Sequence, residues 1–313
     1  MRTFLTTRIG LLQVCAAGVL WGTGGLTVQE IRRGSDMSPM VISAYRMVIA
    51  AVVLLVACLA MRILGQVRLI FRAHPWHAVL VGAGTGAYQA LYFESVVNVG
   101  VTVSTVVSLA VAPVLLTVVD TVRMKVRPTR TRVLVLVAAL AGLVLVSAFS
   151  GDGTTGPHPA IGVIEAVGSG TAYAITTIFG RTLARSYKPI VVATTMCCVG
   201  TAVLVPVAAI LSTIDPSTIV TANGATMGWL VYLGIPTMAL AYGLLYAGLR
   251  TTPESSAVIA TLLEPVTAAL AAAVVLGERL GVAGVVGTVL ILVAVAGLEH
   301  APEAAVATVS ELS

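Results

Sequence analysis

Long apolar segments, separated by short polar ones, follow one another along almost the whole chain. A helix needs about 20 apolar residues to cross the hydrocarbon of a bilayer. Ten segments reach about this length, and the connections between them leave no room for a separate soluble domain. The segments are 9–26, 39–60, 76–95, 101–119, 133–149, 160–179, 190–211, 227–249, 255–276 and 282–298. We therefore predict an all-α integral membrane protein with ten transmembrane helices.

The composition supports a lipid environment. Hydrophobic residues make up 58% of the chain and charged residues only 10%, with a mean hydropathy of +1.02. Soluble domains carry about 25% charged residues, so this apolar excess exceeds what a globular core can hide. The four cysteines lie in apolar runs without His or acidic neighbours at ligand spacing, so we expect neither disulfides nor a metal or other cofactor.

The basic residues are distributed unequally between the two sides of the predicted membrane. The side that includes the N-terminus holds fourteen Lys and Arg, mainly at 62–72, 123–132 and 181–188, and the other side holds three. Cytoplasmic loops carry such an excess of positive charge. We therefore expect both termini in the cytoplasm. The charge of +5 orients the protein in its membrane and requires no nucleic-acid partner.

Short motifs recur at a nearly constant offset. The run AYQALY at 87–92 returns as AYGLLY at 241–246, and APV at 112–114 returns as EPV at 264–266. Each half then holds five helices, and an odd number turns the second half upside down relative to the first. Inverted repeats of this kind are typical of transporters, in which the solute path lies between the halves.

The offset also sets the domain boundaries. We predict a first five-helix repeat at 1–150, a second at 151–299, and a loose cytoplasmic tail at 300–313.

Glu264 and Pro265 stand in the middle of segment 255–276, about 15 Å from its start. A carboxylate at this depth is costly unless it is protonated, paired or facing water. Pro265 has no N–H and should free the carbonyl of Thr261, so that a polar, kinked spot lines a cavity. The alternative is a protonated Glu264 that only packs against a neighbouring helix. Ala112 occupies the matching position of the first half, so this polarity is one-sided.

Arg46 is the only basic residue inside a predicted span, about seven residues from the start of 39–60. Long basic side chains near a helix end extend to the membrane surface. We expect Arg46 to do so on the outer side, with a position in the solute cavity as the alternative.

Tyrosines repeat at helical spacing in both halves. Such rings offer apolar faces and hydroxyl groups to an organic solute. Packing or anchoring at the membrane surface is the equally weighted alternative. The predicted lining consists of Trp21, Tyr88, Tyr92, Tyr173, Tyr242 and Tyr246, with Thr261 one turn before Glu264.

Four motifs resemble one family. They are LWGTGG from Leu20, SPMVISAYRMVIAA from Ser38, LLEPV from Leu262, and LGERLGVAGVVGTVLILVAVAGL from Leu276. The sequence is similar to the ten-helix EamA-type members of the drug/metabolite transporter superfamily over nearly its whole length. The resemblance implies two inverted five-helix repeats with a central cavity, and export of metabolites, amino acids or drugs from a bacterial cell. Residues that match the family pattern are Trp21, Arg46, Glu264, Pro265, Gly277 and Glu278.

The favoured function is therefore a secondary transporter in the bacterial inner membrane, with a small organic solute and membrane lipid as its partners. A proton carried on Glu264 would give antiport, whereas facilitated diffusion needs no titrating group. Glycines near segment 282–298 suit close helix packing, including a homodimer contact.

Two other functions are weighed. A nucleotide-sugar or sugar-phosphate exchanger of the same superfamily would need more buried cations than Arg46. A membrane-embedded enzyme would need clustered acids or a nucleophile with its base, and no span carries paired carboxylates at helical spacing. We expect no enzymatic activity.

Overall fold

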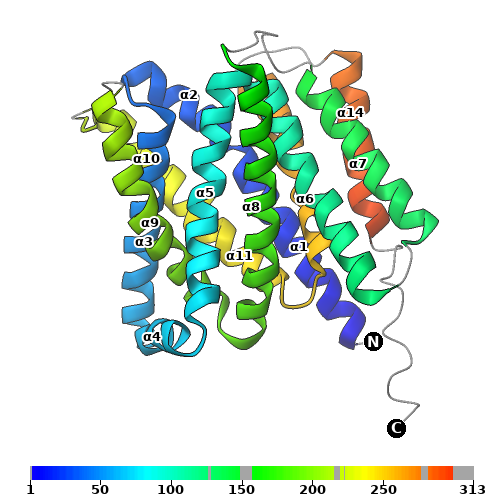
Figure 1. Cartoon of the computed structure of the whole chain (residues 1–313), viewed down its shortest axis with the longest axis horizontal. Helices are drawn as coiled ribbons and strands as arrows, with labels where there is room; N and C mark the ends of the chain where they lie inside the picture. The colour runs from blue at the N-terminus through cyan, green and yellow to red at the C-terminus, as the bar shows by residue number, and fades with distance from the viewer. Residues whose placement is uncertain are drawn as a thin grey trace.

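The computed structural model describes residues 2–125, 128–148, 157–214, 219–221, 223–275 and 281–298, so the predicted tail at 300–313 lies outside them. These residues form a bundle of helices (Figure 1). In chain order the helices are α1 (Arg2–Gly22), α2 (Gly24–Gly34), α3 (Pro39–Ala60), α4 (Leu64–Ala73), α5 (Pro75–Val99), α6 (Val101–Met124), α7 (Arg130–Ala148), α8 (Pro159–Ser186), α9 (Pro189–Ile214), α10 (Gly224–Gly234), the π-helical segment η1 (Ile235–Leu240), α11 (Ala241–Gly248), α12 (Glu254–Ala260), α13 (Leu263–Val275) and α14 (Val282–Gly297).

The predicted membrane segments all lie on helices. Eight helical stretches of the described residues are long and apolar enough to cross a membrane, and each coincides with a predicted segment. The remaining two segments, 76–95 and 282–298, lie on α5 and α14. The all-α membrane fold is therefore confirmed.

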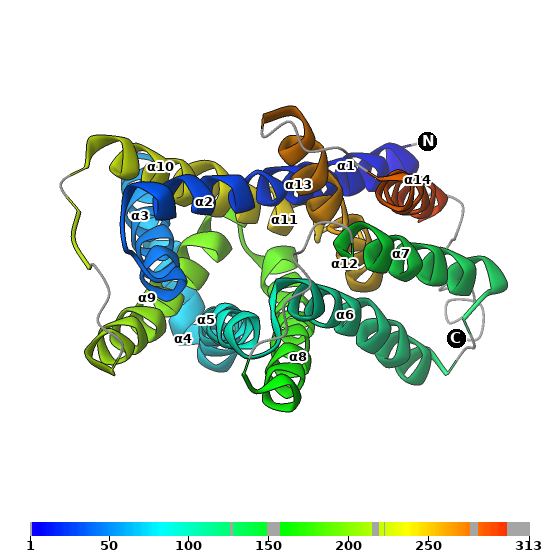
Figure 2. The ribbon, with the colours of Figure 1, turned by 90° about the horizontal axis from the view of Figure 1, so that it is seen from above.

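Helix contacts relate the two halves by an approximate twofold axis. The pair α5–α8 corresponds to α1–α11, α6–α8 corresponds to α1–α13, and α5–α9 corresponds to α3–α10. The pairs α3–α9 and α7–α14 each join equivalent helices of the two halves. Seen from above, these last two pairs lie at opposite ends of the molecule (Figure 2). This is the arrangement expected of two inverted five-helix repeats.

Local sequence signals set several helix starts. Pro39, Pro75 and Pro159 stand in the first turns of α3, α5 and α8. Proline suits this position because its missing N–H has no partner in a helix and its fixed φ is helical. Gly100 joins α5 to α6 with φ of 90°, in the left-handed region that favours glycine. The chain thus reverses direction between two spans at a single residue.

The contact between α7 and α14 depends on two glycines. A Cβ atom on Gly142 would lie 2.6 Å from the Gly287 carbonyl oxygen, and one on Gly287 would lie 2.8 Å from that of Gly142. The two backbones therefore touch, as small residues permit in membrane bundles.

We expect Gly142→Ala to destabilise the protein by about 1–3 kcal/mol, because the added methyl group meets rigid backbone rather than a flexible side chain. Thermal unfolding of the purified protein in detergent measures this effect. Gly228→Ala in α10 is the matched control, since a Cβ atom there meets nothing within 4 Å. Equal melting temperatures for the two variants would show that the contact is not close.

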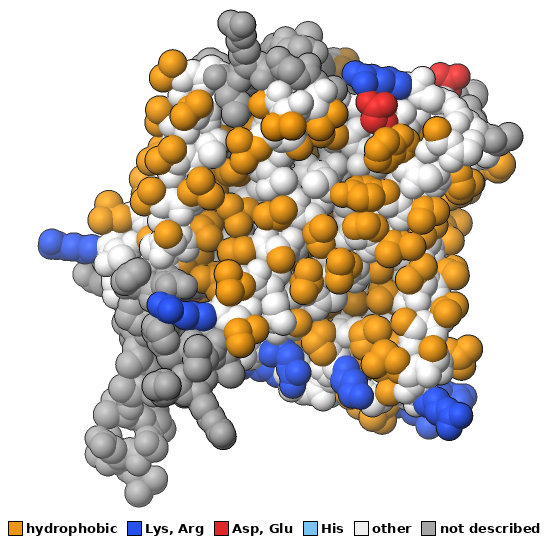
Figure 3. Space-filling view, turned by 180° about the vertical axis from the view of Figure 1, so that it is seen from behind, with side chains coloured by type: hydrophobic (Ala, Val, Ile, Leu, Met, Phe, Trp, Pro, Cys, Tyr) orange, Lys and Arg blue, Asp and Glu red, His pale blue; other side chains and the backbone are white. Residues whose placement is uncertain are grey.

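The surface is banded as a bilayer requires. Hydrophobic side chains cover the middle of the face in Figure 3, and most of the basic side chains gather toward its lower edge. Figure 1 places the start of α1 and the short helix α4 at that same lower end of the bundle. The basic end is therefore the end where the chain begins.

Candidate functional site

The span that carries Glu264 is broken. Helix α12 ends at Ala260 and α13 begins at Leu263, with a tight turn between them. The prediction that Pro265 leaves the Thr261 carbonyl open is wrong, because the Glu264 N–H donates to that carbonyl at 2.9 Å. Pro265 cannot donate to the Thr261 carbonyl, so the preceding residue Glu264 donates instead. This i→i−3 bond is of the 3₁₀ type, which is frequent at helix ends.

The break lies against α1. A Cβ atom on Gly22 would lie 2.5 Å from the backbone oxygen of Glu264, and one on Gly18 would lie 3.2 Å from Cα of Thr261. These two glycines therefore let the irregular backbone approach α1 closely. The Glu264 side chain, in the first turn of α13, remains partly exposed. A carboxylate at a helix N-terminus is favoured by the helix dipole.

A second irregular segment faces Arg46. Between α10 and α11 the chain widens into η1, and Nη2 of Arg46 donates to the Thr237 carbonyl there at 3.0 Å. We expected Arg46 to extend to the outer surface. Its side chain instead donates a hydrogen bond to the second half of the bundle. Within the described residues, no ion pair involves Arg46, and its Nε is buried without a hydrogen-bond partner.

The charges of Arg46 and Glu264 act on each other across the bundle, although they form no direct ion pair among the described contacts. Arg46 also lies near the hydroxyl of Tyr242. The carboxyl group of Glu264 and the guanidinium group of Arg46 therefore lie near each other beside the two irregular segments. Such segments are common at functional sites in membrane transporters, where unwound backbone contributes polar groups.

Aromatic rings connect these charged groups to the helices around them. Trp21 meets Tyr242 edge-on with ring centroids 5.0 Å apart, and Tyr242 lies 6.1 Å from Tyr246. Separations of this size are typical of favourable aromatic pairs. These three rings come from α1 and α11, so they join the first half to the second.

A second group of rings lies on α5 and α8. Tyr88 stacks on Tyr92 at 6.5 Å and approaches Tyr173 at 5.3 Å. The hydroxyl of Tyr173 is 3.3 Å from Oγ1 of Thr261, at the break. Glu264 lies near Tyr88, Tyr92, Tyr173 and Tyr242. The structure thus brings the ten residues singled out from the sequence into one region, and their role in binding a solute stays a prediction.

Three of the buried polar atoms without partners belong to α1, α3 and α5. Nε1 of Trp21, Nε of Arg46 and Oε1 of Gln89 are buried and make no hydrogen bond. Leaving such atoms unpaired is costly, so each is a candidate contact for a ligand. Gln89 was not predicted from the sequence. Its position beside Tyr88 inside an apolar helix was the available signal.

A cluster of ion pairs at the basic end of the bundle was also not predicted. Arg181 of α8 pairs with Glu254, the first residue of α12. Arg132 of α7 pairs with Asp120 of α6 at 2.7 Å and donates to the Ser255 hydroxyl. All four charged side chains are largely buried. Helix α12 is therefore held by α7 of the first half and by α8 of the second.

Among the described residues, no group of three or more His, Cys, Asp or Glu side chains is placed to hold a metal ion. The four cysteines are free thiols. The chemistry of the site therefore consists of one acid, one base, and aromatic and hydroxyl groups.

Comparisons with known proteins identify the family. The EamA-like transporter family matches the chain twice, over residues 8–148 and 160–299. The uncharacterized transporter YwfM of Bacillus subtilis (strain 168) is 30% identical over 292 residues, which cover 93% of this chain and 94% of that protein. A crystal structure with 20% sequence identity has a TM-score of 0.75 and matches 92% of this chain and 95% of its own, which supports the fold alone. The chain belongs to the EamA-like transporter family.

Proposed function

We propose that this membrane transporter is a proton-coupled exporter of small organic solutes, such as amino acids, metabolites or drugs, in the bacterial inner membrane. The observation that carries the proposal is the environment of Glu264. This carboxyl group is partly exposed at the turn between α12 and α13, and it lies near Arg46 and four tyrosines. A carboxyl group inside a membrane bundle is a functional candidate by default.

Coupling follows if solute and proton compete for the same carboxyl group. The deprotonated form of Glu264 attracts a cationic or hydrogen-bond-donating group of the solute. Protonation from the outer side removes that attraction and releases the solute outward. The proton then leaves to the cytoplasm when the next solute binds there. One proton enters for each solute exported, so the inward proton gradient drives export.

The orientation rests on charge. The end of the bundle that holds the start of α1 is rich in Lys and Arg, and such ends face the cytoplasm. We therefore propose that the ion pairs of α12 lie on the cytoplasmic side. We propose that these pairs close the cytoplasmic end in this structure, and that they separate when the site opens toward the cell interior. In transporters with inverted repeats, one end of the solute path opens while the other end closes.

A homodimer through α14 remains part of the proposal. Gly284 and Gly287 of this helix are buried within the chain, and a Cβ atom on Gly287 would meet α7. A partner would therefore contact the opposite face, where Val285, Val289 and Val293 are exposed at helical spacing.

Comparative metabolite profiling tests the function. Medium from cells that express the wild-type protein is compared with medium from cells that carry an empty vector. The proposal predicts that at least one small organic solute accumulates outside only with the protein. No such solute, together with no resistance to added drugs, would contradict export.

We expect Tyr88→Ala and Tyr242→Ala to change the relative export of different solutes more than they change the protein level. Loss of an aromatic contact is worth about 0.5–1.5 kcal/mol, or up to roughly tenfold in the preference between two solutes. The measurement is the ratio of exported solutes, normalised to membrane protein. Tyr→Phe at the same positions keeps the ring and should retain the preference. A collapse of expression in the Ala variants would assign these rings to packing.

A further inference from the structure

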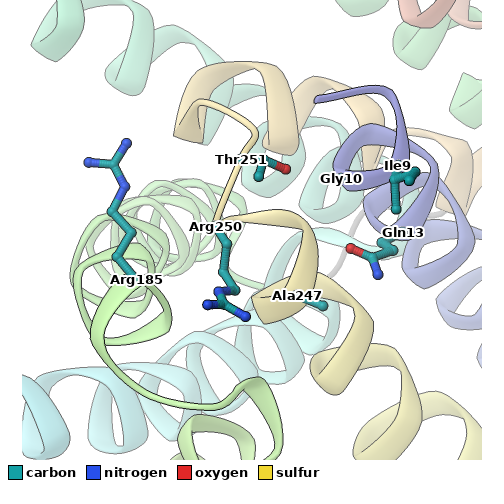
Figure 4. Close-up of a pocket in the computed structure, with 7 residues that line it drawn as sticks. All are labelled: Ile9, Gly10, Gln13, Arg185, Ala247, Arg250 and Thr251. Carbon is teal, nitrogen blue, oxygen red and sulfur yellow. The ribbon is translucent and has the colours of Figure 1, made fainter. Parts of the chain in front are cut away.

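A pocket of about 390 Å³ opens at the basic end of the bundle, between α1, α8 and the end of α11 (Figure 4). None of its residues belongs to the region around Glu264. In Figure 4, Arg250 lies between Arg185 on α8 and Gln13 on α1. The residues that line it are Ile9, Gly10, Gln13, Arg185, Ala247, Arg250 and Thr251.

The pocket is positively charged and its charge is not neutralised by the described part of the chain. Its lining contains two arginines and no acidic residue. Neither Arg185 nor Arg250 takes part in an ion pair between described residues. The nearby Arg181 already pairs with Glu254 and donates to the Leu249 carbonyl at the end of α11. The other two guanidinium groups are therefore available to an external anion.

The inner wall of the pocket is rigid. A Cβ atom on Gly248 would lie 2.5 Å from the backbone oxygen of Gly10, so α1 and α11 touch directly below the lining residues. The amide of Gln13 adds a hydrogen-bonding group to the lining. Guanidinium groups with neighbouring polar groups suit a phosphate ester, which accepts several hydrogen bonds at once.

An apolar stripe leads from the pocket toward the middle of the membrane. Ile9, Leu12 and Val19 of α1 are 55%, 67% and 42% exposed, and their spacing places them on one face of the helix. A free phosphate ion would make no favourable contact with this apolar stripe, whereas a lipid acyl chain would pack along it. Arg185 and Arg250 lie at the ends of the two apolar spans Pro159–Ser186 and Gly224–Gly248, where lipid headgroups are expected. Basic pockets between membrane helices on this side bind anionic lipid headgroups.

We propose that this pocket binds the phosphate headgroup of an anionic phospholipid, with Arg185 and Arg250 as the main contacts and one acyl chain along α1. The site is separate from the solute region, so it holds a lipid whether or not the proposed export is correct.

Binding is measured on the purified full-length protein in detergent. Phosphatidylglycerol, phosphatidylcholine or inorganic phosphate is titrated, and retained lipid is followed by native mass spectrometry together with the melting temperature. Phosphatidylglycerol should bind the wild-type protein and raise its melting temperature, as any ligand specific for the folded state does. We expect R185Q/R250Q to weaken this binding by about tenfold or more, since each basic contact near a membrane surface is worth about 1 kcal/mol.

The matched control is R68Q/R72Q, which removes two exposed arginines from α4 at the same end of the bundle. Its affinity for phosphatidylglycerol should equal that of the wild type. The single variants R185Q and R250Q should give intermediate losses, and size-exclusion chromatography verifies that each variant is folded. Equal binding of both lipids, or an equal loss in the control, would overturn the proposal. Saturation by inorganic phosphate at the same affinity would assign the pocket to a free anion and overturn the lipid assignment.

Discussion

Replacing Glu264 with glutamine is expected to abolish proton-driven transport while leaving the helical bundle intact. Glutamine has nearly the same size and keeps hydrogen-bonding groups at the break between α12 and α13, but it cannot release a proton. The attraction between Arg46 and Glu264 is lost as well. Glutamine resembles the protonated form of Glu264, which binds the solute weakly in the proposed cycle. Solute exchange in the absence of a proton gradient should therefore be slower and need a higher solute concentration.

The measurement uses purified protein in liposomes with an imposed pH gradient and a solute found by metabolite profiling. Wild-type protein should accumulate the solute against its gradient, and Glu264→Gln should reach only equilibration. Glu165→Gln is the matched control, because Glu165 lies on α8 and accepts a hydrogen bond from Asn98 rather than facing the rings around Glu264. Wild-type pH dependence in Glu264→Gln would show that this carboxyl group serves packing alone.

The second large effect is expected at the start of α12. Arg181→Gln leaves the Glu254 carboxylate without its cation at a position where the two side chains are only 12% and 14% exposed. Breaking a fully buried pair costs about 3–5 kcal/mol. Partial exposure reduces this to an effect on the order of 2 kcal/mol. Amide hydrogens at 254–260 should then exchange about 30-fold faster, because local opening becomes more frequent by that factor.

Hydrogen–deuterium exchange with mass spectrometry measures this opening peptide by peptide. The double variant Arg181→Gln with Glu254→Gln should recover much of the protection, since no charge is then left unpaired. Arg33→Gln is the control. Its ion pair with Glu30 is exposed and lies on α2, at the opposite end of the bundle from α4. If Arg181→Gln exchanges like the wild type, the pair does not hold α12, and the proposed closure of the cytoplasmic end has to be placed elsewhere.

Prolines show how far sequence patterns predict this fold. Pro113 lies inside α6, which stays continuous, and the Thr117 hydroxyl donates to its carbonyl at 2.7 Å. Pro206 lies inside the equally continuous α9. In contrast, Pro236 falls in a π-helical segment, and Pro265 follows the tight turn between α12 and α13. All four stand in apolar runs of similar composition. The runs predict the helices, but the local shape at each proline depends on neighbouring helices that the sequence does not place.

The candidate site was predicted unevenly for a similar reason. Glu264 and the repeated tyrosines attract notice because polar groups are rare in apolar runs. The pair of Arg181 and Glu254 lies 73 residues apart in sequence. Each of the two residues looks like an ordinary charge at a helix end, so only the folded arrangement shows that they meet. The sequence singles out Arg46 as a candidate, but it does not predict where the side chain points. The Thr237 carbonyl that Arg46 contacts lies in the other repeat.

The segment η1 and the turn before α13 belong to the second half, whereas their counterparts α5 and α6 are uninterrupted. In the first half the interruption lies elsewhere, between α1 and α2, whose counterpart α8 is uninterrupted. In a transporter with two identical inverted halves, the inward-facing and outward-facing forms are related by a twofold rotation and have equal free energy. Here the two halves are interrupted at different helices, so we expect the two forms to differ in free energy and the empty carrier to have a preferred resting orientation. The half-saturation concentration for a transported solute should then differ between the two faces of the membrane.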